Sequence, residues 1–303
     1  MVVDCAIIGG GPAGLNAALL LGRARRKVVL FDDDKPRNAV TQHSHGFITR
    51  DGVSPAEFRA IGQQELAQYP SVEIHSTRIE TVIKQGTAFE LVATSGEKFE
   101  AANIMLATGI QEILPEVEGI YDYYGKSLFN CPYCDGWELR DKPLVIIAEN
   151  GMAAFHVPKV LYNWSSDIVV CTNGHSVLDE EQKLFLAKYG IRVIEEKIAA
   201  LAGQDGQLER VVFENHPDIE RAGGLVAVQW KQATSIGQDL GCETNALGGI
   251  ATDDLGRTTI KGVYAAGDTV TNLMMAQLIM AAANGSKVAT GVNTDLTTSY
   301  FDQ

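Results

Sequence analysis

The sequence predicts an α/β protein made of two doubly wound domains, and three observations lead to this fold class. The chain opens with a strand–helix–strand unit, a similar unit begins near residue 143, and a run of short strands separates the two. In a βαβ unit the two strands lie parallel, with a right-handed crossover. With 303 residues, of which 46% are hydrophobic, the chain is long enough for two ordinary domains with buried cores.

The first unit reads as strand, tight turn, helix and strand. Val2–Ile8 is an apolar run followed at once by glycine-rich sequence, Pro12–Leu21 is rich in helix formers, and Lys27–Phe31 is a second buried strand. The polar, aperiodic residues 33–52 indicate a long loop before a helix at Pro55–Gln68. A doubly wound domain therefore starts the chain.

The pattern then changes to short strands, which predict a meander. Its expected strands are Val72–His75, Thr77–Lys84, Ala88–Thr94 and Lys98–Glu100. Ala102–Ala107 is another apolar strand, and a linker containing Pro115, Gly119 and Gly125 marks the first domain boundary.

The second unit repeats the alternation of strands and helices. Its expected elements are strands at Pro143–Ala148, Asp167–Cys171 and Arg192–Glu195 and helices at Ala153–Trp164 and Glu180–Tyr189. Strands at Leu208–Glu214, Gly224–Gln229 and Gly262–Ala266 follow, before a C-terminal helix from about Asn272 to Asn293. The two halves repeat an architecture without obvious sequence identity.

Charge and composition exclude several classes of function. Lys and Arg number 25 against 38 Asp and Glu, a net charge of −13 that repels nucleic acids and anionic membranes. The first residues carry no basic segment typical of a signal peptide, and no apolar stretch approaches the ~20 residues of a membrane span. We therefore expect a cytoplasmic protein that binds neither nucleic acid nor membrane.

Gly9, Gly11 and Gly14 form a G-x-G-x-x-G motif between a predicted strand and helix. Without side chains there, backbone N–H groups and the helix N-terminus can approach a pyrophosphate. Asp32 closes the second strand, near the offset expected for an acid that accepts hydrogen bonds from an adenosine ribose. The alternative is a glycine turn that only packs a helix on a sheet, and the motif alone does not separate FAD from NAD.

Cys131 and Cys134 form a C-x-x-C pair, while the other three cysteines are single. Two such thiols can close a disulfide, and one can stabilise the other as a thiolate. Half a zinc site is the alternative, but no second Cys/His pair with suitable spacing follows, so no metal site is expected. Asp135, beside the pair, is either a solvated carboxylate or a proton donor to a departing thiolate.

Near the C-terminus, Gly267 and Asp268 end a strand just before a helix. Asp268 is either a helix N-cap or a carboxylate that accepts a hydrogen bond from a cofactor hydroxyl, and the two roles can coexist.

Together, segments 9–14, 107–109, 131–135 and 262–268 resemble, in order over nearly the whole chain, the low-molecular-weight thioredoxin reductases, which are FAD-dependent disulfide oxidoreductases. The resemblance implies two Rossmann-like domains of the three-layer ββα type, a homodimer, and FAD at the first glycine motif. It also implies an FAD domain that is discontinuous in sequence, 1–114 and 232–303, around a central pyridine-nucleotide-type domain, 115–231, that carries the cysteine pair.

The resemblance further implies roles for single residues. Cys134 corresponds to the thiol next to the flavin, Cys131 to the thiol that attacks the substrate disulfide, and Asp135 to the acid/base. Asp268 corresponds to a ligand of the ribityl and phosphate region, and Gln277 to a glutamine near the flavin ring. The expected FAD-binding residues are Gly9, Gly11, Pro12, Ala13, Gly14, Asp32, Asn38, His45, Thr108, Gly109, Gly267, Asp268 and Gln277.

The sequence departs from this family at the central nucleotide site. Residues 148–153 read Ala-Glu-Asn-Gly-Met-Ala, so Glu149 brings negative charge to the place of a pyrophosphate, and residues 171–175 contain no Arg for a 2′-phosphate. We expect NADPH to be an inefficient electron donor. NADH, ferredoxin or another flavoprotein stays open as donor.

The loop of residues 36–52 departs as well and is similar to the branch that includes the dithiol oxidases of gliotoxin and holomycin biosynthesis. Those enzymes close a small molecule's disulfide and pass the electrons to oxygen. His45 is the candidate base for the substrate thiol, with His43 as the second choice, because imidazole exchanges protons near neutral pH. The expected partner is a thioredoxin-like protein or a small disulfide or dithiol. The rival hypothesis, from outside the class of enzymes, is a non-catalytic flavin-binding redox sensor.

Overall fold

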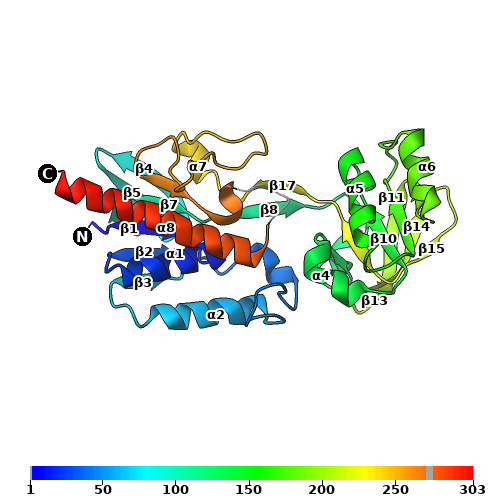
Figure 1. The fold of residues 1–303 in the computed structure, drawn as a ribbon, viewed down its shortest axis with the longest axis horizontal. Helices are drawn as coiled ribbons and strands as arrows, with labels where there is room; N and C mark the ends of the chain where they lie inside the picture. The colour runs from blue at the N-terminus through cyan, green and yellow to red at the C-terminus, as the bar shows by residue number, and fades with distance from the viewer. Residues whose placement is uncertain (1, 271–275, 303) are drawn as a thin grey trace. The chain divides into compact units, whose positions relative to one another are not determined.

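The computed structural model describes residues 2–270 and 276–302, and the chain divides into two compact units (Figure 1). Unit 1 comprises Met1–Ala39, Gly46–Gln111 and Lys231–Gln303, and unit 2 comprises Val40–His45 and Glu112–Trp230. The domain boundaries expected from the sequence are after residues 114 and 231, whereas the two units meet after residues 111 and 230. The expected boundaries also place Val40–His45 in the first domain, whereas the structure assigns this segment to unit 2.

Unit 1 is built on a five-stranded parallel sheet with the order β18-β7-β1-β2-β3. The strands are β1 Cys5–Ile8, β2 Val28–Phe31, β3 Val72–His75, β7 Ile104–Leu106 and β18 Val263–Ala265. Every residue of β1 and β2 is buried, as the unbroken apolar runs of a parallel sheet covered on both faces require. The predicted parallel βαβ unit is confirmed, with Ile7 opposite Leu30.

The two faces of this sheet carry different layers. Ala6 and Ile8 pack against an antiparallel sheet of β4 (Ile79–Gln85), β5 (Ala88–Ala93) and β6 (Lys98–Ala101). Cys5 and Ile7 point to the opposite face, because successive side chains of a strand alternate. That face is covered by helices α1 (Pro12–Arg23), α2 (Pro55–Leu66) and α8 (Leu278–Phe301). The structure therefore confirms the three-layer ββα type.

One strand prediction is wrong in its placement. The sequence pattern assigns Val72–His75 to the meander, but β3 pairs in parallel with β2, with Leu30 opposite Ile74. Helix α2 lies between β2 and β3 in the chain and supplies the crossover that a parallel pair needs. The alternation of apolar and polar residues in this segment predicts a strand but does not say which sheet it joins.

Unit 2 repeats the layers on a second parallel sheet with the order β12-β11-β10-β16-β9. Its strands are β9 Leu128–Phe129, β10 Leu144–Ile147, β11 Ile168–Cys171, β12 Arg192–Ile194 and β16 Gly224–Val226. One face packs on an antiparallel sheet of β13 (Ile198–Gln204), β14 (Gln207–Phe213) and β15 (Ile219–Glu220). The other face packs on α4 (Pro132–Leu139), α5 (Gly151–Leu161) and α6 (Glu180–Lys188).

The remaining elements are short. They are the paired strands β8 (Ile110–Ile113) and β17 (Gln229–Gln232), helices α3 (Ile120–Tyr123) and α7 (Ile236–Asp239), and the 3-10 turns η1 (Arg37–Val40) and η2 (Gly267–Val270). Helix α8 continues to Phe301, beyond the expected end at Asn293, while the expected start at Asn272 lies outside the described residues. No helix among the described residues is both long and apolar enough to cross a membrane.

Helices α1 and α8, from opposite ends of the chain, lie side by side (Figure 1). The Asn16 amide nitrogen donates to the Ala282 carbonyl (2.9 Å) and to the Ser286 hydroxyl (2.5 Å). A Cβ added at Gly285 would lie 2.1 Å from the Ala13 carbonyl oxygen. The glycine lets α8 approach the first turn of α1, directly behind the glycine motif.

We expect Gly285→Ala to lower the free energy of unfolding by about 1–3 kcal/mol, because the new methyl group forces the two helices apart. The measurement is a urea unfolding curve of the purified protein. Thr290→Ala, an exposed change on the same helix, is the matched control and should leave the midpoint nearly unchanged. Equal midpoints for Gly285→Ala and the wild type would contradict the tight helix contact.

Candidate functional site

The glycine motif forms a tight turn between β1 and α1. Gly9 has a φ of +113°, and a Cβ there would lie 2.2 Å from the Ala107 carbonyl oxygen. A Cβ at Gly14 would lie 1.9 Å from the Gly9 carbonyl oxygen. Gly11, in contrast, faces open space, with nothing within 4 Å of an added Cβ. Two glycines thus close the turn, and the third leaves room for a ligand.

Helix α1 begins at this open position. Gly11 is its N-cap and provides no side-chain cap, Pro12 occupies the first helical position, and Ala13 is buried in the first turn. A helix N-terminus without a capping side chain offers its N–H groups and the positive end of its dipole to an anion. The turn can therefore accept the pyrophosphate of a dinucleotide.

Asp32 lies at the end of β2, beside this turn. Its carboxylate sits against the backbone of Gly10, where an added Cβ would lie 2.6 Å from the Asp32 Cγ atom. Its Oδ2 atom accepts a hydrogen bond of 2.5 Å from Arg59 of α2. The structure thus brings the predicted ribose acceptor to the glycine turn, and it adds a partner, Arg59, that the sequence analysis misses.

The end of β7 and the turn η2 meet through Thr269. Its buried hydroxyl oxygen accepts a hydrogen bond of 2.8 Å from the Gly109 amide and lies 3.3 Å from the Thr108 hydroxyl. Gly267, with a φ of +67°, donates its N–H to the Asn284 side chain (2.8 Å). Residues 108, 109 and 267, which are far apart in sequence, therefore lie together in unit 1.

Asp268 lies inside η2 and forms an ion pair of 3.1 Å with Arg37 of η1, the turn that also contains Asn38. The N-cap interpretation of Asp268 is wrong for the C-terminal helix, because residues 271–277 intervene and Gln277 is the N-cap of α8. The Gln277 side chain makes no capping hydrogen bond to α8.

The cysteine pair lies in unit 2, at the start of α4. Cys131 is the N-cap and Pro132 the first helical residue, and the Cys134 and Asp135 amides donate to the Cys131 carbonyl oxygen (3.3 and 3.2 Å). The two Sγ atoms are 2.7 Å apart. A helix N-terminus stabilises a thiolate. The geometry suits reversible disulfide formation.

Asp135 is buried beside the pair, with 8% of its surface exposed. Burial raises the pKa of its carboxyl group to about 7, and the negative charges of Cys131 and Glu138 add to the effect. A carboxyl group with such a pKa can both give and take a proton near neutral pH. This environment favours the proton donor over the solvated carboxylate among the two interpretations of Asp135.

His45 also lies against α4. Its Nε2 atom is 3.7 Å from the Glu138 Oε1 atom, and the rings of His43 and His45 are 6.3 Å apart. Glu138 is one helical turn after Asp135, so the imidazole and the two carboxyl groups lie along one helix. Sequence reasoning misses Glu138, because nothing in the pattern distinguishes it from a solvated glutamate.

The central nucleotide turn of unit 2 is occupied by the chain's own side chains. Glu149 accepts a hydrogen bond of 2.6 Å from the Asn173 amide, and Asn150 caps α5 by accepting from the Ala153 amide (2.9 Å). A Cβ at Gly151 would lie 2.6 Å from the Val177 carbonyl oxygen. The loop after β11 therefore packs against the start of α5, at the turn that the family resemblance marks as a second nucleotide site.

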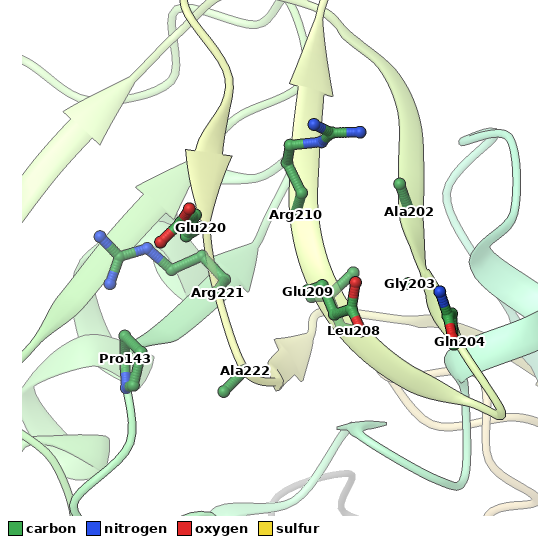
Figure 2. A pocket seen from close by; sticks show the side chains of 10 residues that line it. All are labelled: Pro143, Ala202, Gly203, Gln204, Leu208, Glu209, Arg210, Glu220, Arg221 and Ala222. Atoms are coloured by element: carbon green, nitrogen blue, oxygen red, sulfur yellow. The ribbon is translucent and has the colours of Figure 1, made fainter.

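A pocket of about 640 Å³ lies elsewhere in unit 2 (Figure 2). It is lined by residues of β13, β14 and β15, the two residues after β15, and Pro143 at the amino end of β10. The cysteine pair follows the carboxyl end of β9, a strand parallel to β16 and β10, so the pocket is at the other end of this sheet. Arg221, which lines the pocket, donates a hydrogen bond to the Asp167 carboxylate (2.6 Å).

Among the described residues, no group of three or more His, Cys, Asp and Glu could hold a metal ion.

Comparisons with known proteins agree with this arrangement. The family model described as pyridine nucleotide-disulphide oxidoreductase matches residues 3–286. A crystal structure of a putative thioredoxin reductase, TrxB, from Bacillus anthracis is 46% identical, with a TM-score of 0.95, over 98% of this chain and 99% of that one. The structure of HlmI is 32% identical, with a TM-score of 0.93, over 99% and 94%. Thioredoxin reductase aclD of Aspergillus oryzae is 30% identical over 97% of this chain and 96% of its own.

The raised pKa of Asp135 predicts a specific dependence of stability on pH. Below pH ~4 the carboxyl is protonated in both folded and unfolded chains; as pH rises toward 7, only the unfolded chain releases the proton, so stability falls. Asp135→Asn should remove this loss and be the more stable protein at pH 8 by a few kcal/mol. Urea unfolding at pH 5 and pH 8 measures it. Asp141→Asn is the control, and a difference between Asp135→Asn and the wild type that does not change with pH would contradict the assignment.

Proposed function

The chain belongs to the pyridine nucleotide-disulphide oxidoreductase family, and from this premise we propose that it is an FAD-dependent enzyme that exchanges electrons with a dithiol or disulfide through Cys131 and Cys134. Its relatives make it a thioredoxin reductase-like oxidoreductase that acts on disulfides. The observation that carries the finer proposal is the close pair of cysteine sulfurs at the start of α4, 2.7 Å apart, with Asp135 buried beside it.

The residues of unit 1 fit FAD. The open surface at Gly11 and the uncapped start of α1 suit the pyrophosphate, and Asp32 suits the adenosine ribose. We assign Asp268 to the ribityl and phosphate region and Gln277 to the flavin ring. Bound FAD supplies two-electron redox chemistry between thiols and a second electron carrier.

The thiols carry out the exchange in two steps. The Cys131 thiolate attacks a substrate disulfide, which forms a mixed disulfide and releases one substrate thiolate. The Cys134 thiolate then attacks Cys131, which closes the protein disulfide and releases the second. Asp135, with a pKa of about 7, donates a proton to a leaving thiolate, and His45 is the second candidate for proton transfer. The reverse sequence oxidises a dithiol.

We further propose that NADPH is not an efficient electron source. The Glu149–Asn173 hydrogen bond and the loop over the start of α5 occupy the place of a pyrophosphate, and residues 171–175 offer no guanidinium to a 2′-phosphate. A carboxylate there repels phosphate groups. In the reductase direction NADH, ferredoxin or another flavoprotein stays a candidate donor, and in the oxidase direction a dithiol supplies the electrons.

The same observation favours a second candidate, a small-molecule dithiol oxidase. In that direction a dithiol loses two electrons and two protons, and oxygen accepts both to form hydrogen peroxide. A thioredoxin-like protein is the partner in the reductase direction. We also propose that the protein is a homodimer and that it is located in the cytoplasm. The rival function is a redox sensor without catalysis, which steady turnover of any dithiol or disulfide would exclude.

An anaerobic titration of the flavin with NADPH, NADH and a reduced dithiol, each alone, tests the electron source. We expect the dithiol to bleach the oxidised flavin band, the band to return on admission of air, and NADPH to leave it unchanged. Rapid bleaching by NADPH, or submicromolar NADPH binding by calorimetry, would refute the closed nucleotide site. Bleaching by NADH alone would identify the protein as an NADH-dependent reductase.

Single cysteine variants separate the two thiol roles. Cys134→Ser should abolish the charge-transfer absorbance of a thiolate next to flavin, whereas Cys131→Ser should preserve or expose it, and each should lower turnover by orders of magnitude. Absorbance spectra of the purified variants measure the difference. Cys242→Ser, a change at a buried cysteine of unit 1, is the control. The reverse pattern of spectra would exchange the two roles.

A further inference from the structure

Three consecutive acids, Asp32, Asp33 and Asp34, follow β2 and are held by two arginines. The Arg59 Nη2 atom lies 2.5 Å from Asp32 Oδ2 and 2.6 Å from Asp34 Oδ1. Arg78 lies 3.2 Å from Asp33. The two arginines differ in burial, because the Arg59 side chain is 8% exposed and that of Arg78 is 47% exposed.

Arg59 is an unusual choice for a purely structural position. Its Nε atom is buried and has no hydrogen-bond acceptor among the described residues. A buried donor without an acceptor costs free energy, and so does the burial of the guanidinium itself. An apolar residue on α2 would fill this position more favourably, so the contact with the two carboxylates is the feature that requires an arginine.

The Asp32 carboxylate is fixed from two sides. Arg59 binds its Oδ2 atom, and the Asp34 amide donates to its Oδ1 atom (3.2 Å). Its carboxylate lies against Gly10, inside the glycine turn, and its side chain is only 12% exposed. Each carboxylate oxygen still has a lone pair free. The remaining acceptor positions are therefore held in one orientation next to the open surface at Gly11.

We propose that Arg59 is a positioning residue for cofactor binding: it holds Asp32 in the orientation that accepts hydrogen bonds from the hydroxyls of an adenosine ribose. The inference rests on the proposed binding of FAD at the glycine turn. Arg59 acts through Asp32 and also neutralises part of the negative charge of residues 32–34, which would otherwise repel the pyrophosphate.

Arg59→Lys tests this inference, because lysine keeps the positive charge, but its side chain is shorter and does not bring a nitrogen to the position of Nη2, the atom that makes both contacts. Apoprotein is titrated with FAD and with an FAD analogue whose adenosine ribose lacks both hydroxyls, and binding is followed by flavin fluorescence. We expect Arg59→Lys to raise the Kd for FAD about tenfold or more. Wild type and variant should bind the analogue with equal affinity, because the contact that Arg59 supports no longer exists.

Arg78→Lys is the matched control and should leave both affinities unchanged. If Arg59→Lys weakens FAD and the analogue by the same factor, Arg59 has a structural role only, and the proposal is overturned. An unchanged Kd for FAD would also overturn it, without touching the proposed function. Failure of the wild-type apoprotein to bind FAD would instead refute the FAD assignment. If Arg59→Lys does not fold, the double variant Arg59→Met/Asp32→Asn replaces it, because it removes the buried charge together with its partner. We expect this double variant to fold and to bind FAD and the analogue with the same Kd.

Discussion

Close backbone contact at the glycine turn is the constraint on which unit 1 depends. The Gly14 Cα lies so close to the Gly9 carbonyl, and Gly9 so close to the Ala107 carbonyl, that no side chain fits at either glycine. These contacts fix the start of α1 against the carboxyl ends of β1 and β7. Gly285 repeats the arrangement from the other side, where α8 touches the Ala13 carbonyl. Segments from both ends of the chain therefore converge on one turn, and this convergence explains why a single domain draws on discontinuous sequence.

Unit 2 has the same layers as unit 1 but a different turn between the first strand and helix of its βαβ unit. Its parallel sheet, antiparallel sheet and helices match those of unit 1, yet its turn carries the side chains of Glu149 and Asn150. Asn150 satisfies an amide at the start of α5 that a phosphate would otherwise bind, and Glu149 is tied to Asn173. The fold alone does not make a nucleotide site. The ability to bind phosphate depends on two or three side chains at one helix N-terminus, and those side chains differ between the units.

The layered fold could be predicted from the sequence because buried parallel strands read as unbroken apolar runs and the glycine motif marks a strand–turn–helix junction. The parallel pair β1–β2 could be predicted as well, but the sequence could not supply the partner of every strand. The pattern of Val72–His75 identifies a strand but not its partner β2. The sequence analysis did not identify Arg59 and Glu138 for a related reason. Each is a single charged residue on a helix, and its role depends on which loop the helix packs against. A motif can be recognised because its reactive residues lie close together in the sequence. The residues that support them come from distant segments and reach the site only through tertiary packing.

The first turn of α4 places two opposed electrostatic effects on neighbouring residues. The helix N-terminus stabilises negative charge at Cys131, while burial disfavours it at Asp135. The two groups are also coupled, because negative charge on Cys131 raises the pKa of Asp135. When the thiolate is present, Asp135 therefore stays protonated to a higher pH. When Cys131 enters a disulfide this charge disappears, while the larger effect of burial stays, so the pKa of Asp135 falls part of the way toward its usual value. In the proposed reaction the state of the sulfur thus changes the acidity of the neighbouring carboxyl group, and the two groups on one helical turn couple the transfer of electrons to that of protons.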